Sequence, residues 1–405
     1  MLYQTYQAQA DGLEPFRLLA EATKGLLGYG PPSALENPFL RGIAASCALV
    51  SRVQLTHKRP AFEIPSIAIG NREVEVTEEA VDRTPFCTLL HFKKDSEAKQ
   101  PPVLLVAPMS GHFATLLRDT VRTILPEHDV YITDWHNARE VSLRDGRFGF
   151  DEFVDHLIRF LERLGGEAHL IAICQPCVAA LAAVAIMAED ENPTQPRSMT
   201  LMAGPIDTRI NPTKVNEFAT SHPLEWFERN LIGVVPQGLR GALRRVYPGF
   251  LQLSAFMGMN MSRHVKSLHD LYNHLVTGDR EKASTTWKFY EEYFAVMDLP
   301  AEFFLETVQL VFQEHALAKG ELTWHGRRID CGAIRRPLLL TVEGERDDIC
   351  AVGQTLAAQE LCARLRPYKK RHYVQTGVGH YGAFSGRRWN TQIYPMVRDV
   401  IYSSA

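Results

Sequence analysis

The sequence predicts an α/β protein with a mostly parallel, doubly wound sheet, an inserted helical cap and a helical N-terminal extension. Two observations lead to this prediction. Short apolar runs that suit buried parallel strands alternate with amphipathic helical patterns in the middle of the chain and again near its C-terminus. Between these two stretches the alternation stops, and the residues show aromatic-rich helical patterns.

The N-terminal part has two different patterns. Residues 1–60 carry helical patterns separated by loops, so we expect a helical extension there. Within 66–76, Gly70-Asn71 separates two alternating runs and predicts a β-hairpin, and 88–92 can add a third strand.

Regular alternation defines the core, which we expect to span 61–206 and 337–405. The strands predicted after the hairpin are 103–107, 130–133, 169–173, 199–202, 338–342 and 371–374. The helices predicted between and after them are 114–125, 151–164, 175–187, about 354–365, and a last one from about 389. Residues 207–336 form the predicted cap, inserted late in the sheet.

Composition narrows the class of protein. The chain has 405 residues, of which 45% are hydrophobic and 22% charged, as in ordinary folded proteins. The net charge is -3 without a block of basic residues, which argues against nucleic acid as the main partner. No secretory signal pattern and no apolar run of membrane-spanning length stands in the sequence, and the seven cysteines are scattered. We therefore expect a cytoplasmic protein without a transmembrane segment.

The segment Ala172–Cys177 carries the strongest chemical signal. It joins a predicted buried strand to an apolar helix, and Cys174 stands at the junction. A nucleophile elbow places Ser, Cys or Asp on such a turn, with small residues two positions to either side. Ala172 fits this pattern, whereas Pro176 stands where glycine is usual, although proline is tolerated in a first helical turn.

Two further segments supply partners for Cys174. Asp347 follows the strand at 338–342, and His380 follows the strand at 371–374. The order nucleophile, acid, histidine is that of the α/β-hydrolase fold, so we expect Cys174, Asp347 and His380 to form a catalytic triad. Asp348 competes with Asp347, and the Gly-x-x-Asp spacing from Gly344 favours Asp347.

An oxyanion hole is expected from two backbone segments. One N–H comes from Gln175, the residue after the nucleophile. The other comes from the loop after the strand at 103–107, where Met109 and Ser110 are the candidates. Ser110 and His112 can contact substrate or structure this loop, and the sequence leaves both readings open.

Redox, metal and nucleotide chemistry agree less well with the candidate residues. The spacing Cys174-x-x-Cys177 at a helix start is typical of thiol–disulfide oxidoreductases, but that function leaves Asp347 and His380 unexplained. No second Cys or His pair stands at zinc-ligand spacing, so we expect no metal. No glycine-rich phosphate loop is present, so we expect no nucleotide cofactor.

Five segments resemble the intracellular polyhydroxybutyrate (polyhydroxyalkanoate) depolymerases: 110–118, 131–139, 173–176, 198–209 and 377–382. The resemblance implies an α/β-hydrolase fold, a Cys-Asp-His triad at Cys174, Asp347 and His380, and cleavage of amorphous storage granules to 3-hydroxybutyrate or oligomers. It implies the granule surface as partner and site of action. Some members of the family pass the acyl group to coenzyme A, so the acceptor stays open, as does a homodimer.

Related polyester synthases are the first alternative. Their elbow resembles Gly-x-Cys-x-Gly and a histidine follows their catalytic Asp, whereas this chain has Ala172, Pro176 and Asp348 at those positions. A non-catalytic granule-associated protein is a second alternative. For a depolymerase, the segments 234–239 and 247–250, where Pro and Gly interrupt apolar residues, are the expected mobile lip of the cap.

Overall fold

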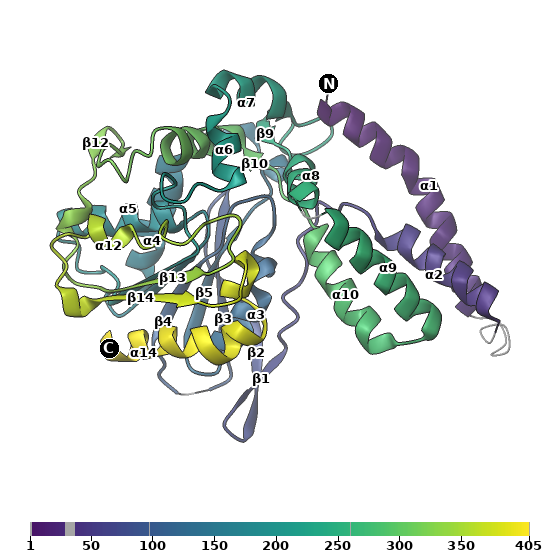
Figure 1. Cartoon of the computed structure of the whole chain (residues 1–405), viewed down its shortest axis with the longest axis horizontal. Coiled ribbons are helices and arrows are strands. Elements are labelled where there is room, and N and C mark those ends of the chain that lie inside the picture. The colour runs from purple at the N-terminus through teal and green to yellow at the C-terminus, as the bar shows by residue number, and fades with distance from the viewer. Residues whose placement is uncertain (1, 29–36, 97, 260, 405) are drawn as a thin grey trace.

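A nine-stranded, mostly parallel sheet forms the centre of the computed structural model, which describes residues 2–28, 37–96, 98–259 and 261–404 (Figure 1). The strand order is β1-β2-β3-β5-β4-β6-β7-β13-β14, with antiparallel pairing up to β5 and parallel pairing from there on. The strands are β1 (Ser66–Ile69), β2 (Arg72–Arg83), β3 (Cys87–Lys94), β4 (Pro102–Val106), β5 (Asp129–Trp135), β6 (His169–Ile173), β7 (Ser198–Met202), β13 (Leu338–Gly344) and β14 (Lys370–Gln375).

The central strands are apolar because helices cover both faces of the sheet (Figure 1). All residues of β6, β7 and β13 are buried. The helices α4 and α5 pack together and against β4 and β6, and α14 packs against β7 and β13. The helices of this core are α3 (Arg118–Ile124), α4 (Phe150–Leu164), α5 (Cys177–Glu189), α12 (Ala358–Leu361), α13 (Gly386–Arg388) and α14 (Tyr394–Ser404). This arrangement is the α/β-hydrolase fold.

Most predicted elements of the core are confirmed. The hairpin pairs Ile69 with Arg72, and Gly70 takes the positive φ of 59° that its tight turn requires. The helix predicted over 354–365 is wrong for most of its length, since only Ala358–Leu361 is α-helical. The reason is that the N–H groups of Thr355 and Leu356 donate to the buried carboxylate of Glu343 instead of to a preceding turn.

The insertion between β7 and β13 is helical, as predicted, but it also contains a small sheet of order β10-β9-β8. Its helices are α6 (Lys214–Thr220), α7 (Leu224–Leu231), α8 (Gly249–Met259), α9 (Met261–Thr277), α10 (Arg280–Tyr293) and α11 (Ala301–Thr307), followed by a π-helical turn at Val308–Gln313. Its strands are β8 (Gly233–Val234), β9 (Arg245–Tyr247), β10 (Leu299–Pro300), β11 (Thr323–Trp324) and β12 (Arg327–Arg328).

Of the two segments expected to form a mobile apolar lip, 234–239 includes the exposed Val234, whereas 247–250 is buried and does not fit this expectation. Tyr247 and Phe250 are both buried. The ring of Tyr247 stacks on Phe304 with 3.9 Å between centroids, and Phe250 stacks on Tyr6 at 4.0 Å. These aromatic contacts join the segment to the interior of the insertion and to the N-terminal helix.

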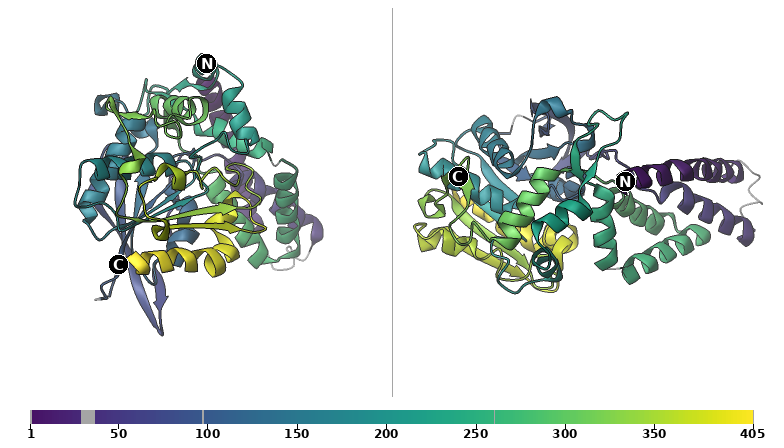
Figure 2. Two further views of the ribbon diagram at one scale, coloured as in Figure 1. Left: turned by 60° about the vertical axis from the view of Figure 1, so that its left-hand side comes forward. Right: turned by 90° about the horizontal axis from the view of Figure 1, so that it is seen from above.

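The N-terminal helices pack on the insertion. The helix α1 (Leu2–Gly28) packs on α2 (Pro38–Arg52), α2 packs on α9, and α9 packs on α10. Together these four helices form an arm that projects from the sheet domain (Figures 1 and 2). At its base, the hydroxyl of Tyr3 donates to the buried carboxylate of Asp298 at 2.5 Å. The division of the chain at residues 60, 206 and 336 stays a prediction. None of the helices within the described ranges has the length and apolar character needed to cross a bilayer.

Candidate active site

Cys174 occupies a strained turn between β6 and α5. Its φ is +67°, a left-handed conformation that is unusual for a residue with a side chain. The turn is closed by hydrogen bonds from Cys174 N–H to the carbonyl of Met202 at 2.8 Å and from Cys177 N–H to the carbonyl of Cys174 at 3.1 Å. Pro176 precedes the first residue of α5 with φ of -69°, which is proline's preferred value. The geometry is that of a nucleophile elbow.

A close packing contact behind the elbow holds this turn. A Cβ added to Gly204 would lie 2.2 Å from the Cβ of Cys177 and 3.2 Å from the carbonyl oxygen of Cys174. Only glycine therefore fits at the end of β7. Cys177 itself is fully buried, and its thiol lies 3.3 Å from the carbonyl oxygen of Ala172. Burial raises the pKa of the Cys177 thiol well above its usual range.

Asp347 and His380 lie side by side at the carboxyl ends of β13 and β14. Nδ1 of His380 is 2.8 Å from Oδ2 of Asp347, and both side chains are buried. The other carboxylate oxygen of Asp347 accepts hydrogen bonds from the backbone N–H groups of Ile349 and Cys350 at 2.9 and 2.8 Å. Three donors therefore fix the carboxylate. Asp348 is exposed.

The ring of His380 interacts with Cys174 as well as with Asp347. Burial of the ring alone would lower the pKa of His380, but the neighbouring side chains of Asp347 and Cys174, each also hydrogen-bonded to the ring, raise this pKa well above its usual value. The structure thus brings Cys174, Asp347 and His380 together. Their catalytic roles remain a prediction.

Glu343 is a buried residue of this region that the sequence did not single out. Its carboxylate accepts hydrogen bonds from the N–H groups of Gly353, Thr355 and Leu356 at 2.7–3.0 Å. The hydroxyl of Thr355 in turn donates to the carbonyl of Gly204 and accepts from its N–H. Glu343 therefore supports the elbow from behind. The sequence signal for it was a glutamate directly after the apolar run of the strand predicted at 338–342.

The loop of Met109 and Ser110 lies beside the elbow, as the oxyanion-hole prediction requires. Ala107 N–H donates to the Thr133 hydroxyl at 2.9 Å, and the Trp135 indole donates to the Ala107 carbonyl at 2.9 Å, so β5 positions the loop. The N–H of Met109 donates to the side-chain oxygen of Gln175 at 3.4 Å. Both proposed donors therefore belong to neighbouring segments.

His112 and Ser110 differ in their surroundings. Ser110 lines a cavity next to Cys174. His112 is buried, and its Nε2 lies 3.2 Å from the carbonyl oxygen of Tyr293 in the insertion. Burial lowers the pKa of His112 to about 4, so the ring is neutral near pH 7 and joins the loop to the insertion. This position favours a structural role for His112.

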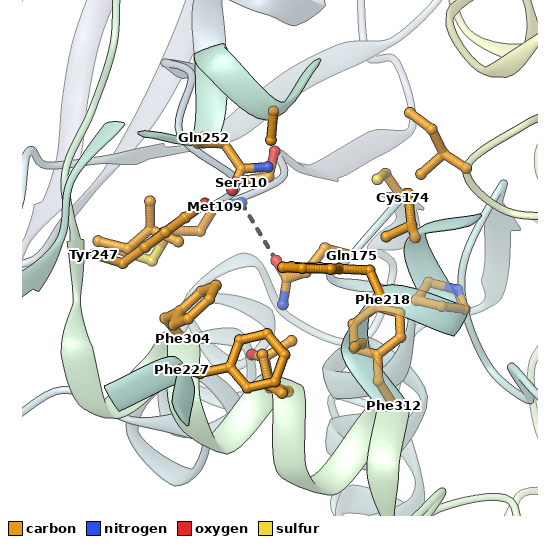
Figure 3. A pocket seen from close by; sticks show the side chains of 18 of the residues that line it. Met109, Ser110, Cys174, Gln175, Phe218, Phe227, Tyr247, Gln252, Phe304 and Phe312 are labelled. Carbon is orange, nitrogen blue, oxygen red and sulfur yellow. Dashed lines mark hydrogen bonds between the residues drawn. The ribbon is translucent and has the colours of Figure 1, made fainter. Parts of the chain in front are cut away.

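The cavity has a volume of about 390 Å³, and Cys174, Gln175, Met109 and Ser110 form part of its wall. Most of the rest of the wall is aromatic or aliphatic, and comes from the insertion. In Figure 3 the side chain of Gln175 crosses between Met109 and the rings of Phe227 and Phe312. The other aromatic wall residues are Phe218, Tyr247, Phe303 and Phe304. Such a wall suits an apolar acyl chain.

Comparison with known proteins assigns the family. The family model described as PHB de-polymerase C-terminus matches residues 203–405, which is half of the chain. The chain belongs to this PHB depolymerase family. It is therefore a PHB depolymerase-like α/β hydrolase, and the resemblance found in the sequence is confirmed.

The chain is 21% identical over 353 residues to the poly(3-hydroxyalkanoate) polymerase subunit PhaC of Haloferax mediterranei, an alignment that covers 82% of this chain and 66% of that protein. The chain thus spans just under two thirds of that relative.

Solved structures similar to this chain include a thermophilic esterase from Thermogutta terrifontis, with 14% identity, 83% and 97% of the two chains covered and a TM-score of 0.40. Another is a 2-hydroxy-6-oxo-6-phenylhexa-2,4-dienoate hydrolase from a Rhodococcus species, with 14% identity, coverage of 81% and 99% and a TM-score of 0.42. Since these scores are low, the fold assignment rests on the strand order and crossovers.

The two neighbouring aspartates of the PHB depolymerase-like site allow a matched test. Asp347→Asn should lower kcat for ester cleavage on the order of 10³- to 10⁴-fold, because the histidine loses its orienting anion. Asp348→Asn should retain most of the activity, because Asp348 is exposed. Rate measurements on a soluble hydroxybutyrate ester check this. A larger loss in the Asp348 variant would contradict the assignment.

The buried ring of His112 predicts that the stability of the fold decreases in acid. The folded-state pKa of His112 is about 4, below the usual 6.5 of an unfolded chain, so unfolding takes up a proton between these values. Its contribution to stability is therefore complete above pH 6.5 and is lost as the pH falls toward 4, at about 1.4 kcal/mol per pH unit. The free energy of unfolding, measured as a function of pH, should fall less steeply over this window in His112→Asn than in wild type. The difference in slope should correspond to close to one proton taken up on unfolding. The exposed His325→Asn should not show this smaller slope, and equal slopes for wild type and His112→Asn would contradict the prediction.

Proposed function

We propose that this protein is an intracellular polyhydroxyalkanoate depolymerase that cleaves the ester bonds of amorphous polyhydroxybutyrate through an acyl-cysteine intermediate. The observation that carries the proposal is the buried Asp347–His380 pair beside a cysteine on a strained elbow, at the wall of an apolar cavity. The products would be 3-hydroxybutyrate or short oligomers, and the site of action would be storage granules in the cytoplasm.

Acylation follows from this geometry. Nδ1–H of His380 donates to Asp347, which leaves Nε2 to take the proton of the Cys174 thiol. The raised pKa of His380 favours the protonated ring that forms in this step. The sulfur then bonds to the ester carbonyl carbon, and the oxyanion is stabilised by the N–H groups of Gln175 and of Met109 or Ser110. When the C–O bond breaks, His380 gives its proton to the departing hydroxyl, and a thioester remains on Cys174.

Deacylation repeats these steps with a second nucleophile. His380 removes a proton from the acceptor, whose oxygen or sulfur attacks the thioester, and then returns the proton to the Cys174 sulfur. Water would yield the free acid, and the thiol of coenzyme A would yield the coenzyme A ester. Both acceptors are compatible with the triad.

Three other functions are alternatives to this proposal. A polyester synthase would run the chemistry toward polymer, and the relative in Haloferax mediterranei is named as a polymerase subunit. A granule-associated protein without catalysis would have no use for the triad. A disulfide oxidoreductase would need both Cys174 and Cys177 to react, but Cys177 is fully buried and its pKa is raised, which disfavours its thiolate.

One experiment separates these functions. Purified protein is incubated with amorphous polyhydroxybutyrate granules, and separately with 3-hydroxybutyryl-coenzyme A. A depolymerase should release soluble hydroxybutyrate from granules and form no polymer from the coenzyme A ester. The variant Cys174→Ala should abolish release, and Cys177→Ala should retain most of it, because of these two cysteines Cys174 lines the cavity and Cys177 is buried behind it.

The other outcomes would replace the proposal. Polymer formation would favour the synthase, and granule binding without release would favour the non-catalytic protein. Equal loss of activity in both cysteine variants, together with disulfide reductase activity, would favour the redox enzyme.

We further propose that the arm meets the granule surface. Several large apolar side chains of α1 are 47–76% exposed, in place of the lip that was expected at 247–250. They are Leu13, Phe16, Leu18, Leu19 and Leu26, and α2 and α9 add Phe39, Val50, Met261 and Val265. An exposed apolar surface of this kind suits contact with an insoluble, uncharged polyester.

The double variant Phe16→Ser, Leu19→Ser tests this partner. It should weaken binding to granules at least about tenfold, since each side chain can bury apolar area worth about 1 kcal/mol or more. Cleavage of a soluble hydroxybutyrate ester should be unchanged, because the triad is untouched. Leu143→Ser, at an exposed position outside the arm, is the control. Equal loss on granules and soluble ester, or a change of oligomeric state with unchanged granule binding, would contradict the proposal.

A further inference from the structure

One of the expected oxyanion donors is already occupied by a side chain of the protein. The backbone N–H of Met109 donates to Oε1 of Gln175 at 3.4 Å, and the dashed line in Figure 3 marks this bond. Gln175 is the residue directly after Cys174, and its side chain is only partly buried. Its oxygen therefore stands in the region that a reacting carbonyl oxygen must enter.

The side-chain oxygen of Gln175 accepts the hydrogen bond that the carbonyl oxygen of a bound ester would accept. An amide oxygen and an ester oxygen are both neutral carbonyl acceptors, so each can satisfy the same N–H. Met109 is almost fully buried, and a buried N–H without an acceptor is unfavourable. In the described part of the chain, the N–H of Gln175 itself has no hydrogen-bond acceptor, so this second donor is ready for an oxyanion.

The surrounding loop restricts other ways to free the Met109 N–H. Gly111 has φ of +94°, and a Cβ there would lie 2.6 Å from Cγ of Gln252, so the loop packs closely on α8. The carbonyl of Gly111 accepts a hydrogen bond from Met297 N–H at 2.8 Å. The backbone of this loop is thus held on both sides, whereas the Gln175 side chain borders an open cavity. Rotation of the Gln175 side chain therefore frees the Met109 N–H with less rearrangement than movement of the loop backbone.

We infer that the Gln175 side chain is a built-in competitor of the substrate, which fills the oxyanion hole of the empty enzyme and must rotate away before the ester carbonyl can enter. This inference rests on the proposed ester cleavage. It makes Gln175 a specificity-determining residue, since a ligand must offer a carbonyl able to replace the glutamine oxygen on Met109 N–H. A ligand that only fills the apolar cavity leaves the hole closed.

Two substitutions test the competitor. Gln175→Leu keeps the size of the side chain and removes its acceptor, and Gln175→Asn keeps the amide but shortens its reach. Each should raise kcat/KM for a soluble hydroxybutyrate ester by roughly two- to tenfold, the equivalent of one hydrogen bond no longer broken on binding. If the substrate carbonyl enters the hole before the chemical step, the gain lies in a lower KM with kcat unchanged.

A matched control separates this effect from a general change of the cavity. Gln252→Leu makes the same chemical change in the same wall, but its side chain packs on Gly111 and does not bond to Met109 N–H. It should not raise kcat/KM. If Gln175→Leu lowers kcat/KM and Gln175→Asn restores it, the amide serves substrate or structure, and the inference is wrong.

A measurement without substrate distinguishes failure of this inference from failure of the proposed function. Hydrogen exchange at the Met109 amide should be faster in both Gln175 variants than in wild type, because the N–H has lost its acceptor. Unchanged exchange in both variants would overturn the inference even if the esterase is active. If exchange is faster in the variants but the protein cleaves no ester, the hydrogen bond between Gln175 and Met109 is supported and the proposed function is wrong.

Discussion

The left-handed backbone of Cys174 is the constraint on which the rest of the site depends. A φ of +67° at a residue with a side chain costs on the order of 1 kcal/mol or more, and it persists only where the surroundings leave no alternative. Here β6 and α5 are buried on all sides, and Gly204 fits against Cys177 without space for a Cβ. The turn projects the thiol from the end of the sheet toward the cavity, where the other groups can reach it.

The supports of the elbow and of the acid–histidine pair are shared. Glu343 in β13 holds the loop that carries Thr355, and Thr355 holds Gly204 behind the elbow. The loops of Asp347 and His380 are also joined directly, since Arg346 N–H donates to the carbonyl of Val378 at 2.9 Å. These hydrogen bonds therefore help to hold Cys174, His380 and Asp347 in their relative positions. The insertion adds the apolar wall and contacts the loop of Met109 and Ser110 through His112 and Gly111.

The sequence predicted features that depend on local pattern. Buried parallel strands have apolar runs because both faces are covered, so β4, β6, β7 and β13 could be predicted from these runs. The order of Cys174, Asp347 and His380 follows from the strands that precede them. Features set by long-range contacts could not be read in this way. The shortened helix at 354–365 depends on Glu343, and burial of 247–250 depends on rings of α1 and α11. The contact of Gln175 with Met109 depends on how two loops meet, and neither residue type signals it.

The proposed mechanism requires a covalent acyl intermediate on Cys174, and this intermediate can be detected directly. The protein is mixed with an activated 3-hydroxybutyrate ester, quenched in acid within the first turnover, digested and analysed by mass spectrometry. One hydroxybutyryl unit should be found on the peptide that contains residues 174–177, and fragmentation should locate it on Cys174. In Asp347→Asn the adduct should form more slowly. An adduct on Cys177, or full ester turnover with no adduct on either cysteine, would contradict the account.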